Sequence, residues 1–286
     1  MITKIEIEQA LGGYYTIDNL LGPVYLDTVE GFGVPESNSI IYDLPYEHGS
    51  TFVFQKYGAR RLSIAGYVVG ETISQFANNR QDLAQAFTFD KEQRTLRITN
   101  DLGEVLVAEV SPASALSFEV RAGQVNACRF SISLVCPDGI FYTETAAVAS
   151  AGVTVLSGGV AIPTAIPADL SSSPSSNVIT ITNQGSAPVY PDSVKLVGPG
   201  TNFTITNRTT GEDVQLNTTL TSAQSAVIDL ARRTATRNDN TNLYAYLTGT
   251  FWKLQPGANI ITLAVGSGST SATLLEITAR SGYFGV

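Results

Sequence analysis

The chain has 286 residues, of which 43% are hydrophobic and only 15% charged, so it holds enough apolar material for two packed domains of ordinary size. Its formal net charge of −8 argues against nucleic-acid binding, which depends on a basic surface. The acidity belongs to the first half, because residues 1–140 hold 10 Lys and Arg against 17 Asp and Glu, while the remainder holds 7 against 8.

The N-terminal stretch MITKIEIEQALGG lacks the apolar core of a signal peptide, and no run of about 18 apolar residues predicts a transmembrane helix. We therefore expect synthesis and folding in a cytoplasm. Cys128 and Cys136 lie on one predicted strand, whose length between them is roughly 26 Å. A disulfide needs Cα atoms about 6 Å apart, so both are predicted to be buried free thiols.

Residues 1–142 are predicted to form a β-sandwich-like α+β domain. ITKIEIEQA alternates at Ile2, Ile5 and Ile7, and RRLSIAGYVVG alternates in the same way. Residues 11–50 are rich in Gly, Pro, Tyr and Asn and offer only short apolar groups such as SIIYDLPY. Further on, RTLRITNDLGEVLVAEV and SALSFEVRAGQVNACRFSISLVC each predict a hairpin, and CPDGIFY ends the pattern.

One helix is predicted at about residues 72–87, in TISQFANNRQDLAQAF. Thr72 followed by Gln75 has the form of a capping box. We expect the apolar stripe to pack on a sheet rather than on a partner protein. The stripe consists of Ile73, Phe76, Leu83, Ala84 and Phe87.

Residues 143–176 have the low charge and the Ala, Ser, Gly and Pro content of a connecting segment, in which VTVL and VAI suggest an edge strand. Residues 177–286 contain about eight short alternating runs between turns, which predicts a galectin-like or jelly-roll β-sandwich. TNRTTGEDV predicts a hairpin with Gly211 at positive φ, and LYAYL predicts a strand with Tyr244 and Tyr246 on one face.

No constellation of catalytic residues is evident. The only histidine, His48, lies in the polar stretch YEHGS and is predicted to be a solvated loop residue, and there is no G-x-S-x-G serine. Zinc ligands at short spacing, a Walker lysine and a calcium loop are also missing from the sequence. We expect neither an enzyme nor a metal protein, although a sequence leaves a pair of facing carboxylates open.

Four stretches, in this order, resemble the distal tail proteins of long, flexible-tailed (siphovirus-type) bacteriophages. They are RRLSIAGYVVGETISQFANNRQDLAQAF, FSISLVCPDGIFY, ITITNQGSAPVYPDSVKLVGPG and FWKLQPGANIITLAV. The likeness runs from about residue 60 to residue 265, and its motifs are strands followed by turns. The chain departs from the family pattern at Gly139, where the family usually has Pro, and residues 11–50 match no part of it.

The resemblance implies a structural virion protein of the tail tip, without a cofactor. Its first domain would form a ring of six copies between the tail tube and tape measure proteins on one side and the tail-associated lysin or receptor-binding hub on the other. Its second domain would project outward and could dock other baseplate proteins. DNA would pass through the lumen unbound, and we expect the acidity of the first half to line that bore. No membrane is involved.

The alternative is a carbohydrate-binding module for host cell-wall glycans, for which Tyr190, Tyr244 and Trp252 are the candidate contacts. Trp252 shares a strand face with Leu254 just before the Pro256-Gly257 turn, and this favours a place in the core of the sandwich. A sugar platform and a contact between subunits are the other two interpretations of Trp252.

Overall fold

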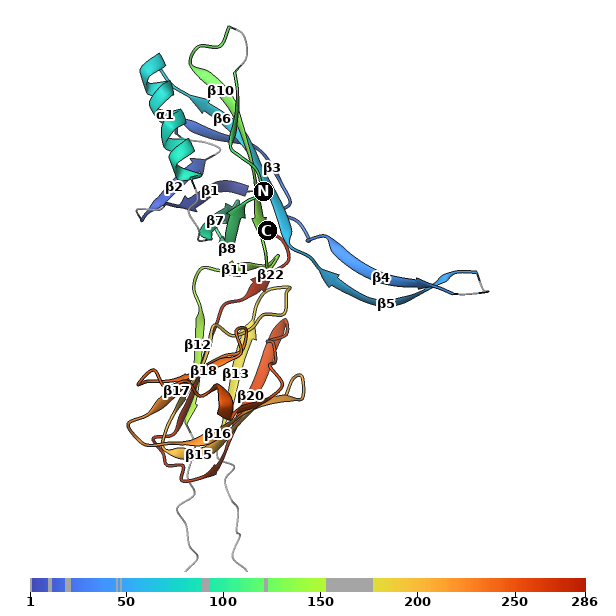
Figure 1. Cartoon of the computed structure of the whole chain (residues 1–286). Coiled ribbons are helices and arrows are strands. Elements are labelled where there is room, and N and C mark those ends of the chain that lie inside the picture. The colour runs from blue at the N-terminus through green and yellow to red at the C-terminus, as the bar shows by residue number, and fades with distance from the viewer. Residues whose placement is uncertain are drawn as a thin grey trace, which may run out of the picture. The chain divides into compact units, whose positions relative to one another are not determined.

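A computed structural model of the chain describes residues 2–9, 12–18, 22–44, 46, 48–88, 93–120, 123–152 and 177–286. The chain divides into two compact units (Figure 1). Unit 1 comprises Met1–Glu144 and Tyr283–Val286, and unit 2 comprises Thr145–Gly282. The second unit is therefore inserted into the first near its C-terminal end.

Unit 1 is built on one sheet whose order is β22-β11-β8-β7-β1-β2-β3-β6-β10-β9. An additional pairing of β8 with β10 joins Leu134 to Pro112 and closes the strands from β8 to β10 into a barrel. The strands are β1 (Ile2–Glu8), β2 (Tyr14–Asp18), β3 (Val24–Glu30), β6 (Arg60–Val69), β7 (Arg94–Asn100), β8 (Val105–Pro112), β9 (Ser117–Glu119), β10 (Ala127–Cys136), β11 (Phe141–Thr143) and β22 (Gly282–Tyr283).

The mainly β prediction with one helix is confirmed, but the sandwich-like form predicted for the first domain is wrong in detail, because closure makes it a barrel. The alternation of β1 is also confirmed, with a register shift between Ile2 and Lys4 that explains the spacing of three to Ile5. Cys128 and Cys136 are buried, free and on β10, as predicted.

The predicted helix is α1 (Ile73–Ala86), and the side chain of Thr72 accepts a hydrogen bond from Gln75 N at 3.2 Å as its N-cap. Phe76, Leu83 and Phe87 are buried against the core of unit 1. Ile73 was predicted in this stripe, but as the first residue of the helix it is 64% exposed. Arg80 stacks over Phe76 and over Phe118 of β9.

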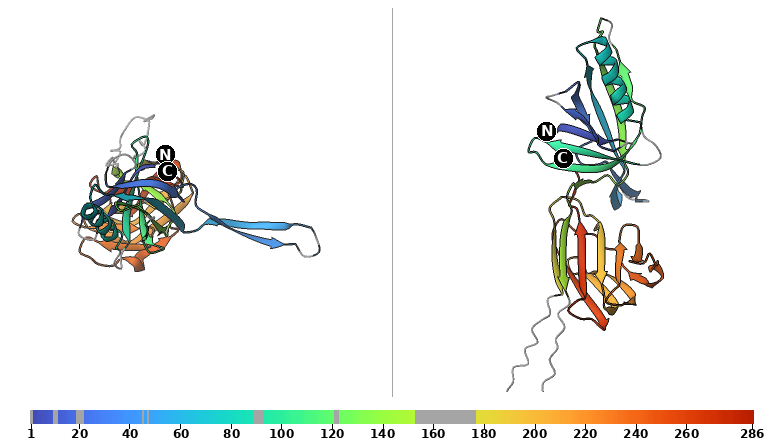
Figure 2. Two further views of the ribbon diagram at one scale, coloured as in Figure 1. Left: turned by 90° about the horizontal axis from the view of Figure 1, so that it is seen from above. Right: turned by 90° about the vertical axis from the view of Figure 1, so that its left-hand side faces the viewer.

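Unit 2 is a sandwich of two five-stranded sheets, in the orders β12-β21-β14-β17-β18 and β13-β20-β15-β16-β19 (Figure 2, right). The sandwich prediction is confirmed. The strands are β12 (Ala147–Gly152), β13 (Val178–Asn183), β14 (Ser193–Val197), β15 (Gly200–Asn207), β16 (Glu212–Leu220), β17 (Ser225–Asp229), β18 (Thr234–Arg237), β19 (Leu247–Gly249), β20 (Gly257–Ser267) and β21 (Leu274–Ala279).

Three local features differ from the pattern of the sequence. LYAYL was predicted as a strand but forms the 3-10 turn η1 (Tyr244–Tyr246), in which Asn242 Oδ1 accepts from Tyr244 N at 2.8 Å. Within the predicted connection, β12 is an edge strand of unit 2 that precedes VTVL and VAI, and these two runs lie outside the described residues. Residues 283–286, predicted with the second domain, lie in unit 1.

Two turns have the backbone that their glycines predict, with φ of 78° at Gly211 and 92° at Gly257. Within the described ranges, no helix is long and apolar enough to cross a membrane.

Candidate assembly interface

β4 (Ser37–Asp43) and β5 (Ser50–Tyr57) form a hairpin, here called the arm. It is a separate two-stranded sheet that does not pair with the strands of the barrel. Figure 1 and the left panel of Figure 2 show its strands running side by side away from the barrel of unit 1. Every residue of both strands is exposed. A lone two-stranded hairpin is marginally stable in water, so this arrangement is typical of an element that is completed by a partner.

The strand register places apolar side chains on both faces of the arm. Directly opposed residues in an antiparallel pair share a face, so Ile40 and Phe54 lie together. Ile41 and Phe52 form the next pair and lie on the opposite face. A register shift between Ile40 and Ile41 leaves Val53 as the extra residue of a bulge and makes these neighbouring pairs possible.

These side chains form an exposed apolar surface unlike the scattered apolar residues that soluble proteins normally tolerate. Tyr42 adds to the face of Ile40, since the two are separated by one residue on β4. Large side chains on the arm are between 41% and 65% exposed: Ile40, Ile41, Tyr42, Phe52, Val53 and Phe54. Because none of the described residues covers either face of the arm, it can bury apolar area against other surfaces on both sides.

Arg60, at the start of β6, holds the base of the arm. Its side chain is buried, and all five guanidinium N–H donors are used. Nε and Nη2 donate to Gly139 O at 3.2 and 3.0 Å, and Nη1 donates to Gly31 O at 2.9 Å and to Gly33 O. Nη2 also donates to Phe284 O, and the guanidinium lies 4.3 Å from the centroid of the Phe141 ring.

Two glycines make this arrangement possible. Gly31 has φ of 85°, and a Cβ there would lie 1.9 Å from Arg61 O. Gly139 has φ of 69°, and its Cβ would lie 2.8 Å from Gly58 O. Either substitution would force the backbone apart at the base of the arm. The departure from the family pattern at Gly139 is therefore a position where this chain needs positive φ.

A buried thiol lies beside the guanidinium. Cys136 Sγ donates to Asp138 Oδ1 at 2.9 Å, and burial, followed by the Asp138 carboxylate, raises the pKa of Cys136 to about 12. Burial lowers the pKa of Arg60, although electrostatic interactions with Cys136 and Asp138 oppose this shift. The thiol is thus kept protonated and is a poor nucleophile, since reactivity belongs to the thiolate.

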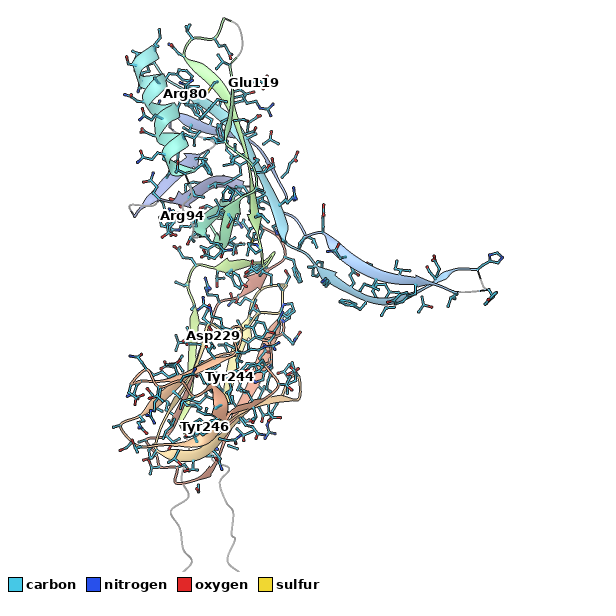
Figure 3. All side chains as sticks on the ribbon, viewed as in Figure 1. Arg80, Arg94, Glu119, Asp229, Tyr244 and Tyr246 are labelled. Carbon is cyan, nitrogen blue, oxygen red and sulfur yellow. The ribbon has the colours of Figure 1, made fainter. Side chains whose placement is uncertain are left out.

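The three residues predicted to contact sugar do not form one platform. Trp252 is fully buried in the core of unit 2, and its Nε1 has no hydrogen-bond partner among the described residues. Tyr190 is partly buried, with Lys253 Nζ 4.9 Å from its ring centroid. Tyr244 is 58% exposed on η1, close in the chain to Tyr246, which is 49% exposed (Figure 3).

Sequence reasoning missed the arm. Its strands lack alternation because both faces carry apolar side chains, and SIIYDLPY gives one short apolar group without a recognisable partner strand. His48 is exposed near the tip of the arm, as the prediction of a solvated loop residue requires. In the described part of the chain, no three His, Cys, Asp or Glu side chains gather in a group that could hold a metal ion.

Two family models match the chain. Residues 24–136 match the phage tail protein RIFT-related domain, and residues 184–279 match the C-terminal domain of the siphovirus-type tail component of the SPP1 Dit family. Together they cover more than two thirds of the chain, which makes it a phage tail component. The chain belongs to the distal tail proteins of siphovirus-type bacteriophages.

Solved structures share the fold. The crystal structure of the SPP1 Dit protein, described as a paradigm of the hub adsorption apparatus in phages infecting Gram-positive bacteria, has a TM-score of 0.65 at 10% identity and aligns over 96% of this chain and 98% of its own. A chain of the phage p2 baseplate, in its activated conformation with Ca, has a TM-score of 0.50 at 13% identity and aligns over 98% of this chain and 99% of its own. A chain of the same baseplate with Sr has a TM-score of 0.51 at 13% identity and aligns over 97% of this chain and 98% of its own. No curated protein sequence matches the chain.

Proposed function

We propose that the protein assembles into a ring, most simply of six copies, which joins the tail tube to the baseplate or receptor-binding hub. The family gives it a structural role at the distal end of a phage tail. The arm is the observation that carries the proposal, because a ring of identical copies needs an element in each copy that binds the next one. An arm with two apolar faces provides such an element in every copy.

Two arguments, its composition and the symmetry of a ring, indicate that the arm binds a neighbouring copy of the chain. Its strands contain one cation, Lys56, and one acid, Asp43, so contacts along its length are mainly apolar. Head-to-tail contacts of identical chains generate a ring when the rotation closes, and each arm then occupies the same surface on the next copy. Association buries apolar area that is otherwise in water, at roughly 25 cal/mol per Å².

The test uses one substitution at two exposed isoleucines. Ile40→Ser removes an apolar side chain from the arm, and Ile73→Ser makes the same change on α1. We expect light scattering after size exclusion to show a ring for the wild type and for Ile73→Ser. The Ile40→Ser ring should dissociate at concentrations about 10- to 100-fold higher, as for a contact at the centre of an interface. A monomeric wild type, or equal effects of the two substitutions, contradicts the proposal.

The other partners follow from this role. The ring would contact the tail tube and tape measure proteins on one side and a tail-associated lysin or the receptor-binding hub on the other, in the virion, after synthesis in the host cytoplasm. DNA would cross its lumen without being bound. The 17 acids and 10 bases of residues 1–140 support an acidic bore that repels phosphates. A basic lumen in a cryo-EM map of assembled tails would contradict the acidic bore.

The second candidate function is carbohydrate binding by unit 2, favoured by the exposure of Tyr244 and Tyr246 on η1. Two exposed tyrosines on one short turn offer apolar ring surface for a sugar, whereas Trp252 is buried and cannot take part. A glycan array with the full chain tests this function. Binding that disappears in Tyr244→Ala supports it, and an array without any signal contradicts it.

A further inference from the structure

Residues Tyr283–Val286, here called the return segment, rejoin unit 1 after the chain has formed unit 2. The segment is attached to the barrel sheet because β22, which includes Tyr283, pairs with β11. Its remaining residues contact the two chain segments that enter and leave the arm.

On the entering side, Val286 N donates to Phe32 O at 3.1 Å. On the leaving side, the ring of Phe284 packs on Tyr57, the last residue of β5, with ring centroids 4.5 Å apart. The Phe284 carbonyl accepts a hydrogen bond from Arg60, which follows the arm by three residues. Phe284 and Val286, which are remote in sequence from the arm, therefore touch the segments on both sides of its base.

Arg60, on the leaving side, bonds to three other segments through one side chain. Its guanidinium binds Gly31 and Gly33 on the entering side, Gly139 in the turn between β10 and β11, and Phe284 in the return segment. A lysine could not replace it, because an ammonium group has three donors from a single nitrogen and cannot reach carbonyls on opposite sides. The Phe141 ring, stacked on Phe32 at 6.0 Å, covers the guanidinium.

These contacts determine the direction in which the arm leaves the barrel, because no described residue further along the arm contacts the barrel. The strands of the arm are exposed throughout and pair only with each other among the described elements. The bond from Gly58 N to Glu36 O at 3.1 Å ties the two strands to each other but does not fix them to the barrel. The orientation of the arm therefore depends on how its base is held. A ring closes only if each arm leaves its unit at a fixed angle.

We propose that the return segment and Arg60 form a clasp that positions the arm for the neighbouring copy. The clasp rests on the proposed ring, and it adds a role for residues that lie outside the arm. Arg60, Phe284 and Val286 are positioning residues in it, since they act on assembly through the arm rather than by touching the next copy.

Three variants test the clasp. One lacks residues 284–286, the second is Arg60→Lys, and the third is Arg61→Lys, which makes the same change at the exposed neighbouring arginine. Amide hydrogen exchange is measured at low concentration, where each variant is monomeric, and assembly is measured by light scattering at high concentration. Residues 62–68 of β6 report on the barrel core in every variant.

We expect at least 10-fold faster exchange in residues 31–36 and 57–60 of the first two variants, unchanged exchange in residues 62–68, and loss of the ring. Arg61→Lys should behave as the wild type. Three outcomes overturn the clasp: unchanged exchange at the base of the arm, equal acceleration in residues 62–68, or an intact ring despite faster exchange at the base. A wild type that forms no ring contradicts the proposed function instead, and the exchange data then still show whether the base of the arm is held.

Discussion

Buried asparagines fix two turns of unit 2 from the inside. Asn259 Nδ2 donates to Gln255 O at 2.7 Å and to Gly257 O at 3.0 Å, and its Oδ1 accepts from Gln255 N at 2.9 Å. Asn183 Oδ1 accepts from Gly185 N at 3.1 Å and from Gly282 N at 3.2 Å. These are the Pro-Gly-x-Asn and Asn-x-Gly motifs of the family resemblance, so the motifs carry turn geometry rather than a binding site.

Replacing the buried Asn259 with alanine removes three part-buried hydrogen bonds to the turn, each contributing about 1 kcal/mol. We expect Asn259→Ala to destabilise unit 2 by about 3 kcal/mol. Asn217→Ala, at an exposed residue with one bond to Thr248, should change stability by less than about 0.5 kcal/mol. Urea denaturation followed by the fluorescence of Trp252, the single tryptophan, measures both, and equal midpoints would refute the role of Asn259.

At the scale of elements, the arm and the barrel of unit 1 depend on different interactions. The core of unit 1 contains no residue of β4 or β5, whereas Phe32 and Phe141 at the base of the arm belong to it. A chain in which residues 38–56 are replaced by a short Gly-Ser turn should therefore keep the stability of its barrel within about 1 kcal/mol. Calorimetry measures this, and a collapse of the barrel transition would show that the arm is a folding element.

Local patterns made the regular elements of unit 1 predictable from the sequence. The strand that begins at Arg60 alternates in and out of the core, and Thr72 with Gln75 marks the start of α1. Three other features depend on contacts between distant residues: the closure of β8 on β10, the pairing of β11 with β22, and the buried Arg60, whose acceptors lie up to 224 positions away. The arm escaped prediction because its strands carry apolar side chains on both faces and therefore show no alternation in the sequence.

At the scale of the whole molecule, alkaline pH should act on the two units differently. Burial, followed by the charge of Asp82, raises the pKa of Tyr15 to about 12, and Cys136 reaches about 12 by burial and Asp138. Both lie in unit 1. In the described part of unit 2, hydrogen bonding between Arg237 and Asp239 raises the pKa of Arg237 and lowers that of Asp239, and this ion pair involves an exposed carboxylate and a partly buried arginine.

The direction of the effect follows from proton binding. Above about pH 9 the unfolded chain begins to lose protons that Cys136 and Tyr15 retain in the folded barrel, so the folded state binds more protons and stability falls as pH rises. The stabilisation is complete below pH 9 and is lost as pH approaches 12.

We expect the calorimetric transition temperature of unit 1 to fall over this range, while the transition of unit 2, followed by Trp252 fluorescence, moves less. Cys136→Val should reduce the slope for unit 1, because it removes one of the buried groups whose pKa is raised to about 12. Equal shifts of both transitions, or an unchanged slope in Cys136→Val, would show that these buried groups do not control the alkaline limit of the fold.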